Sequence, residues 1–279
     1  MDREHIFLEV KDHSVSKETF KLVLDAELKM LKTTPQPSEE ALPAYYESED
    51  YISHTDAKRS VFEKVYHIVK KYALAKKVAL IDSFQTTEKN LLDVGAGTGD
   101  FLLAAKNKGW KVCGVEPNDA AITNAANKGV NLFSSLDKLP NQKFDVITLW
   151  HVLEHLPNLE KQIEQISSFL KPNGVLVIAV PNYESYDAAY YKQFWAAFDV
   201  PRHLWHFSKT AIKNVFGKQG FNLVKVLPMV FDAFYVSLLS EKYKSGKMNF
   251  FKAFWIGWRS NWKAKRSGAY SSLIYVLKK

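Results

Sequence analysis

The chain has 279 residues, of which 47% are hydrophobic and 24% are charged. This is the composition of a globular protein with enough apolar surface to bury its own core. A single cysteine, Cys113, excludes an intramolecular disulfide. The first residues lack a signal-peptide pattern, and no segment approaches the ~20 apolar residues that span a bilayer. We therefore expect a cytoplasmic protein without a transmembrane segment.

The net charge of +8 is concentrated near the C-terminus, where residues 240–279 contain ten lysines and arginines but one acid, Glu241. The remainder of the chain is close to neutral. Aromatic rings recur at helical spacing within residues 250–262, among basic residues. This segment either packs on the sheet, caps a substrate cleft or touches a membrane surface, and packing is the plainest interpretation. No nucleic-acid module is recognisable, so we expect no nucleic-acid partner.

In chain order, residues 1–55 read as an N-terminal extension, because residues 33–38 (TTPQPS) form a cluster of breakers. Residues 56–84 carry apolar side chains at helical spacing and predict one amphipathic helix or two. Short apolar runs then alternate with helix-like segments. Strands are expected at 91–94, 111–115, 131–133, 144–150, 175–180, 221–226 and 272–277, and helices at 101–106, 119–127 and 159–170. This alternation indicates an α/β fold whose parallel sheet is covered on both faces.

A glycine-rich turn, Gly95-x-Gly97-x-Gly99, follows the first of these strands. Such a turn lets a ligand approach the backbone, and the next helix offers unpaired N–H groups. A dinucleotide fingerprint, G-x-G-x-x-G, would need glycine at position 100, which is Asp100. Its negative charge disfavours a pyrophosphate, and with it a nicotinamide-dependent oxidoreductase.

A carboxylate, Glu116, follows the second strand, about 20 residues beyond the glycine turn. At that place it can accept hydrogen bonds from both hydroxyl groups of a ribose. The turn and Glu116 together predict a nucleoside-binding βαβ unit.

The segments LDVGAGTGDFL (92–102), GVEPN (114–118), FDVITLWHVLEHL (144–156), LKPNGVLVIAVPN (170–182) and PRHLWHFS (201–208) closely resemble class I S-adenosylmethionine-dependent methyltransferases. The resemblance covers residues 89–227. It implies a Rossmann-like sheet of seven strands, mainly parallel and with the last strand antiparallel, and S-adenosylmethionine as cofactor. We place the methyltransferase domain at 56–279, its cofactor half at 85–182 and substrate-side elements at 183–210 and 231–270.

By position, the resemblance assigns cofactor-binding roles to residues at the strand ends. Glu116 would hold the ribose, and His151 would lie with Trp150 beside the transferable methyl group. Ser135 departs from the aspartate that many relatives have there, so the adenine contact is open. The remaining residues would bind the amino-acid end (Asp93, Gly95, Ala96, Gly97, Thr98 and Gly99) or the adenine (Pro117, Ser135 and Leu136).

Methyl transfer to a hydroxyl group requires removal of a proton, and histidine titrates near neutral pH. The candidates are His151, His155, His203 and His206. Arg202 would either grip an anionic group of the acceptor or pair with Asp199. Within residues 183–198, Tyr190, Phe194 and Phe198 recur every four residues, which predicts a packed helix face or else a lid over an apolar acceptor.

The N-terminal segment also resembles a variant of the family with a zinc-binding C-x-x-C. Asp25 and Leu28 stand at the cysteine positions, so a thiolate zinc site is excluded and no metal is expected. The segment is then a ribbon without its metal, or a plain helix.

The predicted function is methyl transfer from S-adenosylmethionine to a small molecule, at an oxygen of a quinone precursor, a sugar or another metabolite. The alternatives are a non-catalytic cofactor-binding protein of the same fold and a nucleic-acid methyltransferase.

Overall fold

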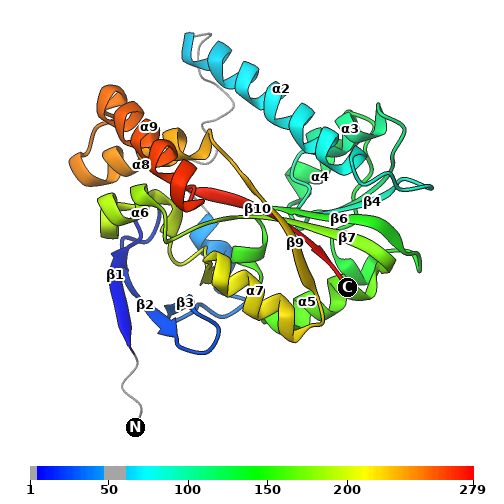
Figure 1. The fold of residues 1–279 in the computed structure, drawn as a ribbon, viewed down its shortest axis with the longest axis horizontal. Coiled ribbons are helices and arrows are strands. Elements are labelled where there is room, and N and C mark those ends of the chain that lie inside the picture. The colour runs from blue at the N-terminus through cyan, green and yellow to red at the C-terminus, as the bar shows by residue number, and fades with distance from the viewer. Residues whose placement is uncertain (1–4, 47–60) are drawn as a thin grey trace.

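The structure of the chain, a computed structural model, describes residues 5–46 and 61–279, with no side chains described for residues 61–66 (Figure 1). The domain boundary expected at residue 55 lies outside the described residues. Among these residues, no helix has the length and apolar character needed to cross a membrane.

The main sheet has six strands and lies between the helices of the molecule (Figure 1). In sheet order they are β5 (Lys111–Val115), β4 (Asn90–Val94), β6 (Phe144–Trp150), β7 (Leu170–Pro181), β10 (Ser272–Lys278) and β9 (Asn222–Pro228). β10 runs antiparallel to both of its neighbours, and the pairs among β5, β4, β6 and β7 are parallel. The mainly parallel sheet with an antiparallel last strand is thus confirmed.

The strand expected at residues 131–133 is replaced by a single bridge between Phe133 and Val115. Phe133 N–H donates to the Gly114 carbonyl and its own carbonyl accepts from Glu116 N–H. Past Phe133 the chain turns into a 3-10 helix, η3 (Leu136–Lys138), so no further rung forms. Within the described residues the main sheet therefore has six strands, one fewer than the seven expected.

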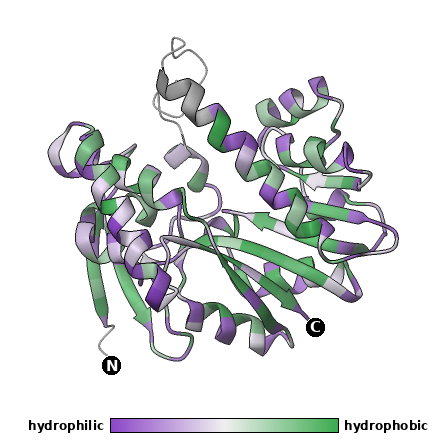
Figure 2. Cartoon of the chain, turned by 45° about the horizontal axis from the view of Figure 1, so that its top comes forward, coloured by the Kyte–Doolittle hydropathy of each residue, from purple (hydrophilic) through white to green (hydrophobic). Residues whose placement is uncertain are grey.

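Helices cover both faces of the main sheet, as its hydrophobic strands require (Figures 1 and 2). Consecutive residues of a strand, such as Leu91 and Leu92, belong to hydrophobic cores on opposite faces of the sheet. The helices on the Leu91 side are α2 (Val61–Asp82), α3 (Asp100–Lys106) and α4 (Asp119–Asn127), and those on the Leu92 side are α5 (Leu159–Ser168) and α7 (Lys209–Lys218).

The N-terminal segment is a ribbon rather than a helix. Its antiparallel strands are β1 (Ile6–Lys11), β2 (Thr19–Asp25) and β3 (Met30–Thr34), and β3 also pairs with β8 (Trp205–His206). At the β2–β3 turn the Asp25 carboxylate accepts hydrogen bonds from the backbone N–H groups of Glu27 and Leu28. The Asp25 carboxylate thus organises this turn.

The expected helix face over residues 183–198 is wrong. The segment forms α6 (Tyr186–Tyr191) and two 3-10 turns, η5 (Lys192–Phe194) and η6 (Ala196–Phe198). Trp195 and Phe198 are buried against the N-terminal sheet, where Phe20 and Leu31 belong to the same core. α6 ends before Lys192, whose φ of 50° lies outside the helical region.

Candidate functional site

The glycine turn lies at the carboxyl end of β4, next to the end of β5. Backbone N–H groups of Gly95 and Ala96 both donate to the Val115 carbonyl, at 2.8 and 2.9 Å. Gly95, Gly97 and Gly99 have φ of 71°, 53° and 74°, the region that favours glycine. A Cβ at Gly97 would meet nothing within 4 Å. The backbone at Gly97 therefore borders open space, and Thr98 beside it is exposed.

Glu116 binds the glycine turn directly. Its Oε2 accepts a hydrogen bond from Gly97 N–H at 2.9 Å, and its Oε1 accepts one from Asn118 N–H at 3.1 Å. The side chain is half-buried, and the next residue, Pro117, is exposed. The structure thus brings the two halves of the predicted nucleoside site together.

Asp93 is buried at the end of β4, where its Oδ1 accepts a 2.6 Å hydrogen bond from the Thr148 hydroxyl. Burial raises its pKa to about 7, against the opposing effects of Thr148 and of the nearby Lys77 ammonium. The protonated and ionised forms of the Asp93 carboxyl group are therefore similarly populated near neutral pH.

Trp150 and Lys77 adjoin Asp93. The Lys77 ammonium lies 4.3 Å from the centre of the Trp150 ring, and burial lowers the pKa of this lysine while Asp93 and Asp232 oppose the shift. Trp150 Nε1 is a buried donor without an acceptor in the described part of the chain. Sequence reasoning missed Lys77, because α2 contains several lysines and only the three-dimensional structure shows which one lies beside the strand ends.

Asp100 opens α3 and is held by two lysines, Lys70 and Lys128, each at 2.6 Å. Its negative charge already occupies the first turn of the helix, in line with the argument against a pyrophosphate. Of the residues expected near the adenine, Ser135 directly precedes η3 and Leu136 has its side chain in the core.

His151, beyond the end of β6, lies between two carboxylates. Its Nε2 is 3.2 Å from Asp232 Oδ2 and its Nδ1 is 3.3 Å from Glu154 Oε1. Burial opposes a charged imidazole, but these two carboxylates outweigh it and raise the pKa of His151 to about 10. His151 is thus an imidazolium at neutral pH and has no lone pair with which to accept a proton.

His155 and His203 form a second group beside Glu154. His155 Nδ1 lies 3.0 Å from the Arg202 carbonyl, and His203 Nδ1 lies 2.9 Å from the Ala197 carbonyl. Burial and the neighbouring His203 lower the pKa of His155 to about 4. One acceptor atom from each of the three side chains lies within 4.8 Å of the other two, and Glu154 Oε2 is buried with no hydrogen-bond partner among the described residues. Sequence reasoning did not predict that these three side chains meet, and together they have the donor types that bind a cation.

His206 stands apart from this group. It is buried on β8 with its Nε2 3.0 Å from the Thr33 hydroxyl of the N-terminal sheet. That hydroxyl donates to the His203 carbonyl at 2.7 Å, so it accepts from His206. The contacts of His206 are those of a residue that fastens β8 to β3.

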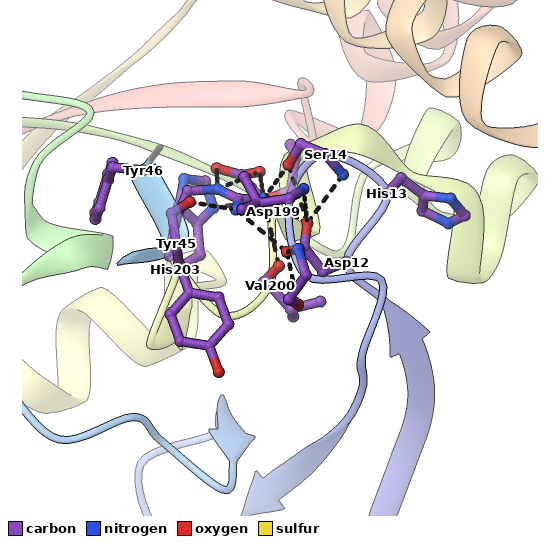
Figure 3. Close-up of polar contacts among 12 residues, drawn as sticks. Asp12, His13, Ser14, Tyr45, Tyr46, Asp199, Val200 and His203 are labelled. Carbon is purple, nitrogen blue, oxygen red and sulfur yellow. Dashed lines mark hydrogen bonds and ion pairs between the residues drawn. The ribbon is translucent and has the colours of Figure 1, made fainter. Parts of the chain in front are cut away.

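Arg202 binds carboxylates of the chain itself. Four residues that it contacts, Asp12, Ser14, Tyr45 and Asp199, lie close together in Figure 3. Its guanidinium nitrogens contact Asp12 at 3.0 Å and Asp199 at 2.7 Å, and they also bind the Ser14 hydroxyl and the Tyr45 carbonyl. Arg202 is only 6% exposed. The pairing interpretation therefore holds, with Asp12 as a partner that sequence reasoning did not find.

A family model described as a methyltransferase domain matches residues 66–226, which is more than half of the chain. The chain belongs to this family of methyltransferases. Its recognition as a class I S-adenosylmethionine-dependent methyltransferase is thereby confirmed.

Two curated relatives of this methyltransferase match it over shorter segments. A ubiquinone biosynthesis O-methyltransferase from Histophilus somni is 36% identical over 110 residues, which cover 34% of this chain and 46% of the relative. A sterol 4-C-methyltransferase from Caenorhabditis elegans is 31% identical over 123 residues, which cover 40% of this chain and 34% of the relative. The match thus spans less than half the length of either relative.

Solved structures share the fold of the methyltransferase. Magnesium protoporphyrin IX methyltransferase from Synechocystis PCC 6803, with bound SAH, has a TM-score of 0.57 at 14% identity and covers 87% of this chain and all of its own. A SAM-dependent methyltransferase from Thermotoga maritima has a TM-score of 0.53 at 18% identity and covers 78% of this chain and 94% of its own. At such identities the likeness establishes the fold alone.

Replacing Arg202 should strongly destabilise the protein. In Arg202→Gln the buried Asp12 loses its counter-charge, so we expect the free energy of unfolding to fall by about 3–5 kcal/mol. Lys218→Gln is the matched control, because its exposed ion pair with Glu27 also joins the N-terminal ribbon to the rest of the chain. Solvent screens that exposed pair, so its loss should leave the stability nearly unchanged. Urea unfolding measures both, and equal losses would contradict the special role of Arg202.

The charge on His151 should depend on Asp232. A raised pKa stabilises the fold fully below the unfolded-state value of about 6.5, and this stabilisation is lost as the pH rises towards about 10. In Asp232→Asn the pKa of His151 should fall. The protein should then lose less stability between these two pH values than the unaltered chain does. NMR titration of the ring nitrogens measures the pKa, with Asp137→Asn as a control. An unchanged titration in Asp232→Asn would refute the pairing.

Proposed function

We propose that this methyltransferase transfers a methyl group from S-adenosylmethionine to an oxygen of a small organic molecule. The observation that carries the proposal is the contact of the Glu116 carboxylate with Gly97 N–H, which joins the ends of β4 and β5 at one edge of the sheet. Ligands of open α/β sheets bind at that edge.

The residues at this edge fit a cofactor made of a nucleoside and an amino acid. Glu116 offers carboxylate oxygens suited to ribose hydroxyl groups, and the open side of Gly97 leaves room beside the backbone. Asp93 and Lys77 provide opposite charges for an amino group and a carboxylate. S-adenosylmethionine, when bound, supplies a methyl group activated by its sulfonium.

A small organic acceptor is supported by the relatives, which are named for ubiquinone biosynthesis and for a sterol. We favour oxygen because several of the relatives are named O-methyltransferases. The cationic His151 at the end of β6 would attract an acceptor oxygen as it loses its proton.

We assign removal of that proton to His155. Its Nδ1 lies 3.0 Å from both the Arg202 carbonyl and the Tyr46 hydroxyl, and the tautomer that donates Nδ1–H to the carbonyl leaves the Nε2 lone pair available. The ring is half-buried rather than sealed in the core, and it adjoins the Glu154 carboxylate that also contacts His151. His206 is unsuited because it is buried and its Nε2 is engaged with the Thr33 hydroxyl.

Glu116→Ala should weaken cofactor binding without unfolding the chain. Loss of hydrogen bonds to a charged acceptor should raise the dissociation constant for S-adenosylhomocysteine at least about ten-fold. Titration calorimetry measures this, with Glu88→Ala, an exposed acid before the opposite end of β4, as the control. Absence of binding to the unaltered chain would overturn the cofactor assignment, and unchanged affinity in Glu116→Ala would overturn the ribose contact.

His155→Gln should lower kcat for methyl transfer by about 10²–10⁴-fold, the usual contribution of a general base. The affinity for S-adenosylhomocysteine should stay the same. Transfer of a labelled methyl group to catechols and other phenols provides the assay, and His5→Gln is the control because His5 is exposed on the N-terminal segment. Undiminished kcat in His155→Gln would exclude this base.

A further inference from the structure

Besides Phe250, five further aromatic side chains of α9 (Phe250–Ser267) are exposed. We call them the α9 aromatic face, and their exposed fractions are 93% for Phe251, 62% for Phe254, 57% for Trp255, 45% for Trp258 and 49% for Trp262. The packing role favoured from the sequence is thus wrong for these rings. So many large exposed rings on one helix indicate a surface that binds something.

Helix geometry gathers these rings into one stripe. At 100° per residue they fall within an arc of about 100° around the helix axis. The three tryptophans stack in series, with ring centres 5.1 Å apart for Trp255 and Trp258 and 6.5 Å apart for Trp258 and Trp262.

The opposite side of α9 attaches it to the protein. It consists of small or apolar buried residues, namely Ala253, Ile256, Gly257, Ser260 and Ala264. Gly257 permits close contact with α8 (Asp232–Ser245), because a Cβ there would lie 2.8 Å from the Phe234 ring. α8 and α9 form a hairpin at the outer end of the molecule (Figure 1). The aromatic face therefore points away from the fold.

Basic residues accompany the rings. Lys252, Arg259, Lys263 and Arg266 occupy one edge of the stripe at helical spacing. Arg266 lies over the Trp262 ring at 5.5 Å, and Lys263 lies over the Tyr186 ring at 4.2 Å. An apolar face of aromatic rings with lysines and arginines alongside is the composition of helices that lie in a membrane interface.

We propose that the α9 aromatic face docks on an anionic lipid bilayer, with the rings among the acyl chains and the basic edge at the phosphates. A second copy of the chain is a poorer occupant. A two-fold interface would place this patch against itself and bring like charges together. The net charge of the segment complements an anionic headgroup layer.

Docking there would place the bilayer near the site, because α8 begins at Asp232, the residue that pairs with His151. The docking itself is independent of the proposed reaction.

The test uses the full chain, without an affinity tag, and vesicles of phosphatidylcholine with or without phosphatidylglycerol. We expect co-sedimentation with the anionic vesicles only, a blue shift of tryptophan emission and quenching by brominated lipids. Trp255→Gln, Trp258→Gln and Trp262→Gln together should abolish binding. Arg259→Gln, Lys263→Gln and Arg266→Gln together should weaken it about 100-fold, at about five-fold for each basic side chain.

The matched controls are Ile68→Gln, an exposed apolar residue on α2, and Lys108→Gln with Lys111→Gln and Lys213→Gln, exposed lysines elsewhere. These should bind like the unaltered chain. Failure of the unaltered chain to bind anionic vesicles at low ionic strength would overturn the proposal, whatever the variants do. So would light scattering that showed a dimer which the three tryptophan substitutions dissociate.

Discussion

Burial of the Arg202 charge is the constraint on which the acceptor side of the structure depends. A guanidinium removed from water needs carboxylates close by, and Asp12 and Asp199 supply them from opposite ends of the sequence. Burial by itself would raise the pKa of Asp12, yet the hydrogen bonds from Arg202 and from Ser16 N–H hold that pKa well below its usual range. The loop that carries His203 is thereby fixed against the N-terminal sheet, and the backbone N–H of Leu204 reaches the Glu154 carbonyl. The N-terminal segment is therefore structurally part of the site.

The cofactor side could be predicted from the sequence because its determinants are local. Gly97 and Glu116 are 19 residues apart in one βαβ unit, and the rule that parallel strands end at a common edge brings them together. Asp12 and Arg202 are 190 residues apart, and no periodicity links them. The short segment at Phe133 is predicted less well. Its sequence indicates a strand, but it does not reveal that only one bridge to Val115 forms.

The histidines show why chemical roles needed the structure. All four candidates stand in segments that the resemblance places near the acceptor, so position alone could not separate them. Their neighbours do: Asp232, which starts a helix near the C-terminus, gives His151 a positive charge, whereas burial beside His203 keeps His155 neutral. A pKa depends on groups within a few ångströms, and these come from distant parts of the chain.

Close packing against neighbouring helices accounts for the outward rings of α9. Helical spacing of aromatic residues within 250–262 predicts an amphipathic helix correctly, but it does not say which face is buried. That choice follows from the approach of α8, which allows no Cβ at Gly257 without contact with Phe234. The buried side of α9 is therefore built from small residues, with Gly257 against α8 and the Ser260 hydroxyl donating to Asp187 of α6. The large rings are left on the surface by close packing, and the basic residues beside them set which surface they can meet.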